Sequence, residues 1–223
     1  RKYPIIIDPT TYYNYSTTKT CGSVDNTGYV WYNGIFYTNE FMLGLAYNTD
    51  YILKWVQGWA EFDLSTLDPD DILSDADIML YQFGYGNDYA GSMIDCDVTK
   101  LTTRPSSYVV SGYGNTTLYN NIKDGTSYCS HDFTTAASSG WKTISEIGSS
   151  STALNDIASA AGGTFSVGFD IVNSGTSSSG RNYIDIYNWS SSNRPKLVLT
   201  ICTPPSGFTA GDDQIICSST ATM

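Results

Sequence analysis

The chain has few basic residues and no long hydrophobic run. Its 223 residues include 11 Lys and Arg against 22 Asp and Glu, which gives a formal net charge of −11 at pH 7. Nucleic-acid binding needs clustered Lys and Arg that displace counterions from phosphates, and the few cations of this chain are scattered. No stretch approaches the roughly 20 apolar residues that a membrane-spanning helix needs. We therefore expect neither a nucleic-acid partner nor a membrane span.

Histidine and metal-type cysteine motifs are also scarce. His131 is the only histidine, so a multi-histidine zinc site is excluded and any Ser/His/Asp or Cys/His catalyst would depend on this residue. The five cysteines show no CxxC spacing. They allow up to two disulfides with one thiol left over, or several buried thiols that pack as small hydrophobic groups: Cys21, Cys96, Cys129, Cys202 and Cys217.

The chain is instead rich in aromatic and small polar residues. Aromatics make up 14% and charged residues only 15%, against a typical content of about 25%. Many Tyr, Ser, Thr and Asn with little Lys and Glu are typical of secreted β-proteins. Because the sequence starts at Arg1 rather than Met, we expect a processed product or a fragment. The expected location is extracellular or at a cell surface.

A period of two dominates the hydrophobic pattern. In residues 164–172 (TFSVGFDIV), alternate residues are apolar, and residues 182–189 and 195–201 repeat the pattern. Similar runs at 28–38, 41–47, 52–62, 76–83 and 93–98 are separated by turn signals at 33–34, 67–70 and 84–87. One helix is predicted over 153–161, capped by Thr152 and stopped by Gly162 and Gly163. The prediction is an all-β, antiparallel β-sandwich of jelly-roll type with one short helix.

Four segments resemble one domain family. They are residues 58–67 (GWAEFDLSTL), 74–81 (SDADIMLY), 165–169 (FSVGF) and 192–199 (SNRPKLVL). Together they resemble DNRLRE-type domains, which are extracellular β-sandwich modules related to a carbohydrate-binding module family. The resemblance covers about residues 20–202 and rests on core and turn residues, so it concerns the fold more than the function.

The two ends lie outside this resemblance. Residues 1–19 are predicted to be a strand-like extension, and 203–223 a linker and C-terminal extension. Residues 210–218 (AGDDQIICS) are similar to the opening of Ig-like or PKD-like repeats in surface proteins of the Bacteroidetes kind. This similarity implies that the chain belongs to a longer surface protein.

Catalysis has little support in the sequence. Glu61 and Asp63 share one strand face, as a carboxylate pair of a glycosidase would, yet both lie inside the family's core signature. His131 and Asp132 are adjacent on a strand and therefore point to opposite faces. We expect a non-catalytic protein.

Calcium is a candidate cofactor, because loops with several Asp supply the oxygen ligands that it takes. Ordinary turn chemistry explains such residues equally well. The candidate ligands are Asp68, Asp70, Asp71, Asp75 and Asp77.

Dense aromatic residues suggest a contact surface. They lie in two stretches, one around residues 31–37 and one from Trp55 to Tyr89 that includes Tyr81 and Phe83. Such rings stack on sugars, but they also fill cores and form protein contacts, so polysaccharide and protein partners stay open. The candidate contact residues are Trp31, Tyr37, Trp55, Trp59 and Tyr85.

The apolar segment 2–7 (KYPIII) suggests assembly. It can add a strand to the sheet of another copy or of another surface protein, or pair with its own sheet. Its candidate residues are Tyr3, Ile5, Ile6 and Ile7. Asn14, Asn115 and Asn188 begin glycosylation sequons. The predicted function is a structural or adhesive surface module that forms filaments by strand exchange, with a carbohydrate-binding module as the alternative.

Overall fold

The computed structural model describes residues 10–15, 18–25, 30–33, 40–47, 53–87, 93–107, 115–134, 139–173, 181–187 and 191–202. In chain order the strands are β1 (Thr10–Tyr15), β2 (Thr18–Asp25), β3 (Val30–Asn33), β4 (Glu40–Tyr47), β5 (Leu53–Asp63), β6 (Ile72–Asn87), β7 (Met93–Lys100), β8 (Ser127–Thr134), β9 (Gly140–Ile144), β10 (Thr164–Asn173), β11 (Asn182–Tyr187) and β12 (Lys196–Cys202). The helices are α1 (Thr116–Lys123) and α2 (Ser151–Ser159), with 3₁₀ turns η1 (Pro105–Ser107) and η2 (Glu146–Ser149).

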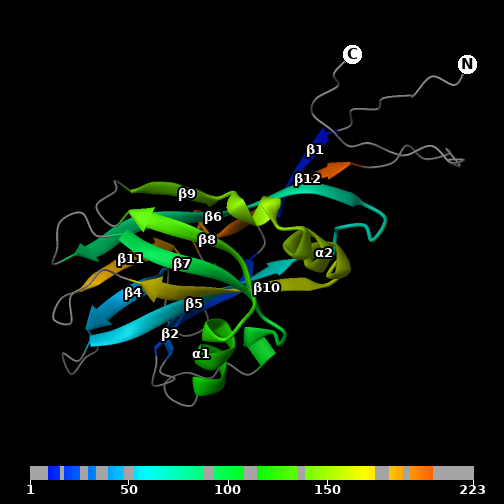
Figure 1. The fold of residues 1–223 in the computed structure, drawn as a ribbon. Coiled ribbons are helices and arrows are strands. Elements are labelled where there is room, and N and C mark those ends of the chain that lie inside the picture. Colours follow the sequence, from blue (N-terminus) through cyan, green and yellow to red (C-terminus); the bar gives the residue numbers. More distant parts are fainter. Residues whose placement is uncertain are drawn as a thin grey trace, which may run out of the picture.

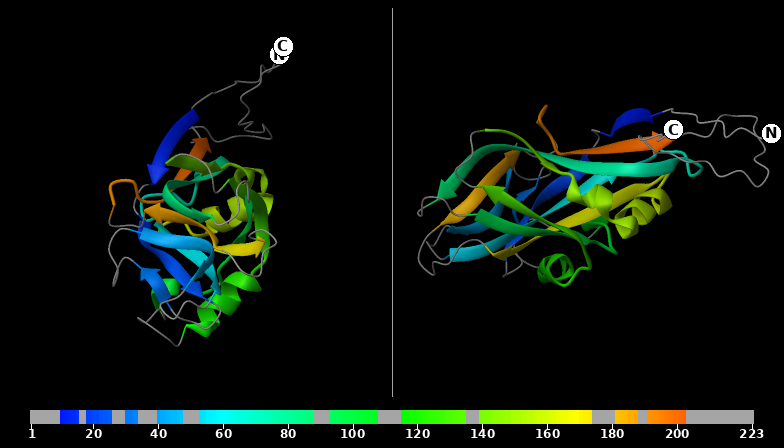
Figure 2. Two further views of the ribbon diagram at one scale, coloured as in Figure 1. Left: turned by 90° about the vertical axis from the view of Figure 1, so that its left-hand side faces the viewer. Right: turned by 45° about the horizontal axis from the view of Figure 1, so that its top comes forward.

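The strands pair antiparallel in the order β1-β12-β6-β11-β4-β5-β10-β7-β8, with β9 on β6 and β2 between β3 and β5. Strand β5 joins two layers, because its start pairs with β4 and its later part with β10. We call β1, β12, β6, β11, β4 and β9 the β6 layer, and β10, β7 and β8 the β7 layer (Figure 1). Seen end-on, the strands surround the core on nearly all sides (Figure 2). The predicted all-β, antiparallel fold is confirmed.

The main core lies between the layers and follows the period of two. In β10, Phe165, Val167, Phe169 and Ile171 are all buried in it. Leu197, Leu199 and Ile201 of β12 enter it from the opposite layer. Burying this apolar surface is the main favourable term for the fold.

Helix α1 packs on the outer side of β10 and β5, and the sequence pattern did not predict it. Leu118 and Ile122, one turn apart, pack with Trp59 in a second cluster. The helix lies close to Gly168, where an added Cβ would stand 3.0 Å from Ile122. For this reason the outer residues of β10 are more buried than alternation alone indicates (Figure 1).

Several predicted boundaries differ from the structure. Helix α2 begins earlier than predicted, because Ser150 rather than Thr152 accepts the hydrogen bond from the backbone N–H of Ala153. Residues 84–87, predicted as a turn, belong to β6, since Gly84 and Gly86 leave room for side chains of β11. Strand β1 and the start of β2 lie within the predicted strand-like extension 1–19, and β1 pairs with β12.

Candidate functional site

The five predicted contact residues do not form one platform. Trp59 is only 1% exposed in the cluster under α1, so its prediction as a surface contact is wrong. Trp55 is partly buried against the main core. Tyr85 is 52% exposed on β6. The side chain of Trp31 and the whole of Tyr37 lie outside the described residues.

A different set of aromatic residues meets on the outer face of the β6 layer. Tyr81 and Phe83 come from β6, Trp141 from β9 and Tyr187 from β11. On one side of β6, the register places Trp141 of β9 directly opposite Tyr81. On the other side, Ile186 of β11 is opposite Gln82, so the next residue, Tyr187, lies beside Tyr81. We call these four residues the aromatic row.

The rings of the row pack on one another. Phe83 and Tyr187 stack with centroids 4.4 Å apart and planes at 19°. The ring centroids of Tyr187 and Tyr81 are 5.5 Å apart, with their planes at 36°. The Trp141 ring stands edge-on to Tyr81, with centroids 5.3 Å apart. Because stacked neighbours lie beside each other on the sheet, Phe83 and Tyr187 present ring edges outward.

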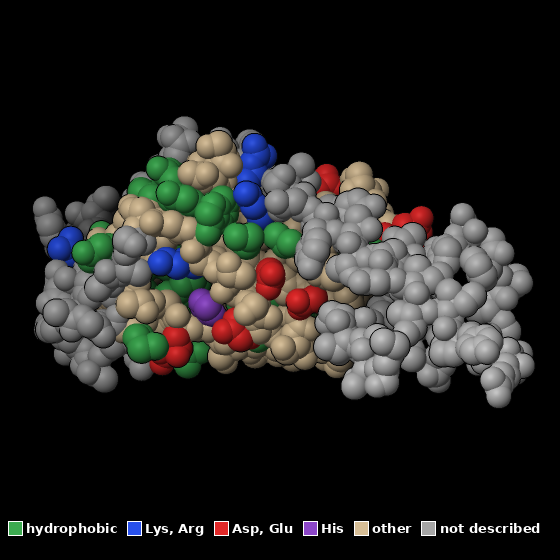
Figure 3. Space-filling view, turned by 90° about the horizontal axis from the view of Figure 1, so that it is seen from above, with side chains coloured by type: hydrophobic (Ala, Val, Ile, Leu, Met, Phe, Trp, Pro, Cys, Tyr) green, Lys and Arg blue, Asp and Glu red, His purple; other side chains and the backbone are tan. Residues whose placement is uncertain are grey.

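A lysine stands at the tryptophan end of the row. The Lys196 ammonium lies 4.2 Å from the centroid of the Trp141 ring, within the range of a cation–π contact. The space-filling view from above shows hydrophobic side chains gathered on this side of the molecule with Lys and Arg next to them (Figure 3). The row is therefore a partly buried aromatic surface with a positive charge at one end.

Carboxylates line the outer face of the β7 layer. Asp170 of β10 is opposite Asp97 of β7, and Asp95 of β7 is opposite Asp132 of β8. Like charges directly across a sheet repel each other. We call these four residues the acidic face.

Two polar side chains support the acidic face. Ser130 donates a hydrogen bond to Asp97, and Gln57 donates one to Asp170 through Nε2. Burial, followed by repulsion from Asp97, raises the pKa of Asp170 to about 6. The Oε1 atom of Gln57 is buried and has no hydrogen-bond partner among the described residues.

The five candidate calcium ligands lie apart in two places. Asp68 and Asp71 close the turn between β5 and β6: the Asp68 carboxylate accepts from the N–H of Asp70, and the Asp71 carboxylate from the N–H of Asp68. Asp75 accepts from the N–H of Ala76 in β6. Burial and then repulsion from Asp75 and Glu146 raise the pKa of Asp77. Over the described ranges, no three His, Cys, Asp or Glu side chains are placed to hold a metal ion.

The carboxylates considered for catalysis have structural contacts. Glu61 is 0% exposed; it accepts from the N–H of Ser106 at 2.9 Å, and its other oxygen is 3.5 Å from the guanidinium of Arg104. These contacts attach η1 to the outer face of β5. Asp63 accepts from the N–H of Ser65 at 3.0 Å in the following turn. His131 pairs with Glu146 at 3.1 Å and not with Asp132.

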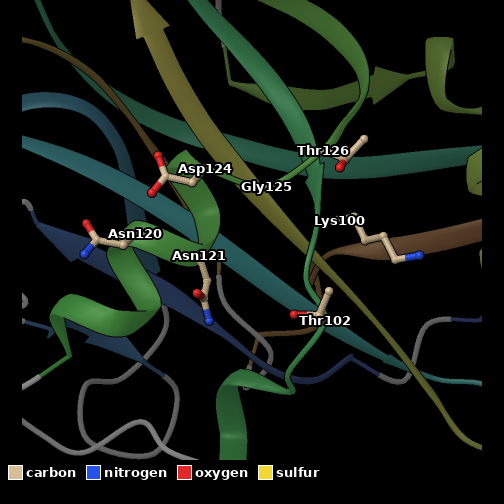
Figure 4. Close-up of a pocket in the computed structure, with 7 residues that line it drawn as sticks. All are labelled: Lys100, Thr102, Asn120, Asn121, Asp124, Gly125 and Thr126. Carbon is tan, nitrogen blue, oxygen red and sulfur yellow. The ribbon is translucent and has the colours of Figure 1, made fainter.

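A small polar pocket opens at the C-terminal end of α1 (Figure 4). Its volume is about 200 Å³, and amide, hydroxyl and charged groups surround it. Lys100, which also binds Asp156 at 2.8 Å, lies on one side, while Asn120 and Asp124 lie on the other. The lining residues are Lys100, Thr102, Asn120, Asn121, Asp124, Gly125 and Thr126.

Most of the residues predicted for assembly and glycosylation lie outside the part of the chain that the structure describes. Tyr3, Ile5, Ile6, Ile7 and Asn188 lie outside the described residues, as does the side chain of Asn14. Asn115 precedes α1 and is only 1% exposed, so in the folded chain its side chain is not accessible for glycosylation. Cys96 and Cys129 are free thiols, and Cys21 is buried in the main core. Neither α-helix of the described part has the length and apolar character to cross a bilayer.

No family model matches the chain, and a search of curated proteins finds no match either. The resemblance to DNRLRE-type domains and the carbohydrate-binding relationship that it implies therefore stay predictions.

Sequence reasoning found half of the aromatic row. Tyr81 and Phe83 were in the predicted aromatic stretch. Tyr187 stands on the polar side of a predicted strand, beside Asp185, which was a usable signal of an outward-facing ring. Trp141 had none, because its place depends on the pairing of β9 with β6, two strands far apart in the chain.

Proposed function

We propose that the chain is a non-catalytic structural or adhesive module of a secreted surface protein, and that the aromatic row makes its protein contact. The packing of the rings carries this proposal. Sugars stack on ring faces, whereas in the row the stacked faces of Phe83 and Tyr187 are turned to each other at 4.4 Å. Lys196 covers one face of Trp141. Ring edges with a neighbouring cation suit a protein surface better, since aromatic residues are enriched at protein interfaces.

A bead assay tests the proposal. Beads coated with the full chain are offered beads coated with the same chain or with polysaccharide. Trp141→Ala and Tyr187→Ser remove rings of the row. Tyr85→Ser removes an exposed ring of β6 that is not one of the four residues of the row, and it serves as the matched control. We expect chain-coated beads to cluster, the two row variants to abolish clustering and the control to keep it. Clustering that survives both row variants would contradict the proposal.

The polar pocket supports a second candidate function, carbohydrate binding. Its amide and hydroxyl groups can form hydrogen bonds with the hydroxyl groups of a single sugar residue, and its 200 Å³ volume excludes a longer chain from its interior. Calorimetric titration with monosaccharides tests this candidate. Binding that Asn120→Ala and Asp124→Ala abolish, and that row variants leave intact, would favour it over the protein contact.

A further inference from the structure

We infer that the aromatic row docks on the acidic face of another copy of this chain, which gives a head-to-tail assembly. This inference rests on the proposed function and names the partner of the same surface. The row and the acidic face lie on the outer sides of opposite layers, so one copy can use both at once (Figure 1).

The row combines ring edges with one ammonium group, while Asp185 lies on the same face of β11 beside Tyr187. Aromatic rings carry a negative face and a positive edge, and the stacked pair Phe83 and Tyr187 turns edges outward. The ammonium of Lys196 adds a full positive charge at 4.2 Å from Trp141.

The acidic face needs an electropositive cover. Two pairs of carboxylates, Asp170 with Asp97 and Asp95 with Asp132, lie directly opposite each other across strands. Lys123 favours the charged form of Asp170, and Asp124 partly offsets its effect. Beside the face, the buried Oε1 of Gln57 is an acceptor with no partner in the described part of the chain, which points to a further donor at this place. Docking of ring edges and an ammonium would relieve the repulsion.

The symmetry of the contact follows from the use of two different surfaces. A contact between unlike patches is heterologous, and it propagates into an open chain unless its rotation closes a ring. The inference therefore gives a route to the filament that needs no strand exchange by residues 2–7.

Charge exchange tests the docking. Sedimentation velocity of the full chain, up to about 1 mM, compares the wild type with Lys196→Glu, with Asp132→Lys and with the variant that carries both. Asp132 is exposed, so its replacement leaves the core intact. Asp70→Lys makes the same change of net charge at an exposed turn and is the matched control. Far-UV circular dichroism verifies that each variant folds.

We expect association of the wild type that weakens about threefold to tenfold in each single variant, is restored in the combined variant and is unchanged in the control. Several results would overturn the docking: no association of the wild type, no restoration, or an equal effect of Asp70→Lys. If Lys196→Glu weakens association and Asp132→Lys does not, the acidic face is not the partner, yet the proposed protein contact of the row stands. Bead clustering that survives both row variants would instead count against the proposed function itself.

Discussion

Replacing Asp170 with Asn is expected to stabilise the protein at neutral pH. The pKa of this carboxyl rises from its ordinary 3.8 to about 6, because the side chain is half-buried and faces Asp97. Asp124 acts in the same direction, while Lys123 and the hydrogen bond from Gln57 oppose it. Asn keeps the shape of the side chain and the acceptor for Gln57 but carries no charge.

The size and the sign of the effect follow from proton linkage. One unit of pKa corresponds to about 1.4 kcal/mol, so a rise of roughly two units sets an upper limit of about 3 kcal/mol. Screening by solvent at a half-exposed site reduces this to about 1–2 kcal/mol. An acid whose pKa is raised by folding binds its proton more tightly in the folded state than in the unfolded state. Its favourable contribution is therefore complete below pH 3.8 and is lost as the pH rises through about 6.

Urea unfolding at intervals from pH 4 to pH 8 measures the prediction. The free energy of unfolding of Asp170→Asn is expected to exceed that of the wild type by about 1–2 kcal/mol at pH 8 and to equal it near pH 4. Asp70→Asn, at an exposed turn, is the control and is expected to show no such pH dependence. A variant that is less stable than the wild type at pH 8, or a gain that is equal at all pH values, would refute the reasoning.

Three further substitutions test local contacts. Tyr128→Phe removes the hydroxyl that donates to Asp156 at 2.8 Å and is expected to lower the free energy of unfolding by about 1 kcal/mol. In a double-mutant cycle with Asp156→Ala, the losses of stability are expected to be less than additive, and additivity would show that the two groups do not interact. Gly86→Ala places a Cβ 2.3 Å from the ring of Tyr183, so a loss of about 1–3 kcal/mol is expected in thermal unfolding, and an unchanged midpoint would disprove that packing. Ser150→Ala removes the cap of α2 and is expected to cost about 0.5–2 kcal/mol, whereas Ser150→Gly is expected to cost only a few tenths; equal losses would contradict the capping role.

Local patterns in the sequence predict most of the β-structure. Strands β10, β11 and β12 alternate apolar and polar residues, and the alternation places the right residues in the core. Strand β6 was predicted too short, because Gly84 and Gly86 usually signal a turn and only the neighbouring strand shows why glycine is needed there. Helix α1 was missed because residues 116–123 contain Thr and Asn, which are weak helix formers. Its packing on Val24, Trp59 and Leu101, which are distant in sequence, stabilises it.

The candidate site was harder to predict than the fold. The aromatic row joins β6, β9 and β11, and the acidic face joins β10, β7 and β8, so neither set is contiguous in sequence. Trp59 illustrates the reverse error: alternation places it on the outer side of β5, and α1 then buries it. The candidate calcium ligands Asp68 and Asp71 close a turn, and calcium binding by the five aspartates stays a prediction.

The most direct test of the proposed assembly is a cross-link between copies. Chains with natural isotopes and chains labelled with ¹⁵N are mixed, treated with a carbodiimide that joins an amine to a carboxylate without a spacer, and analysed by mass spectrometry. The account predicts mixed-isotope peptides that join Lys196 to Asp132 or Asp95. If chains cross-link to each other only through other lysines, or if Lys196 is joined only to other carboxylates, the docking of the aromatic row on the acidic face is contradicted.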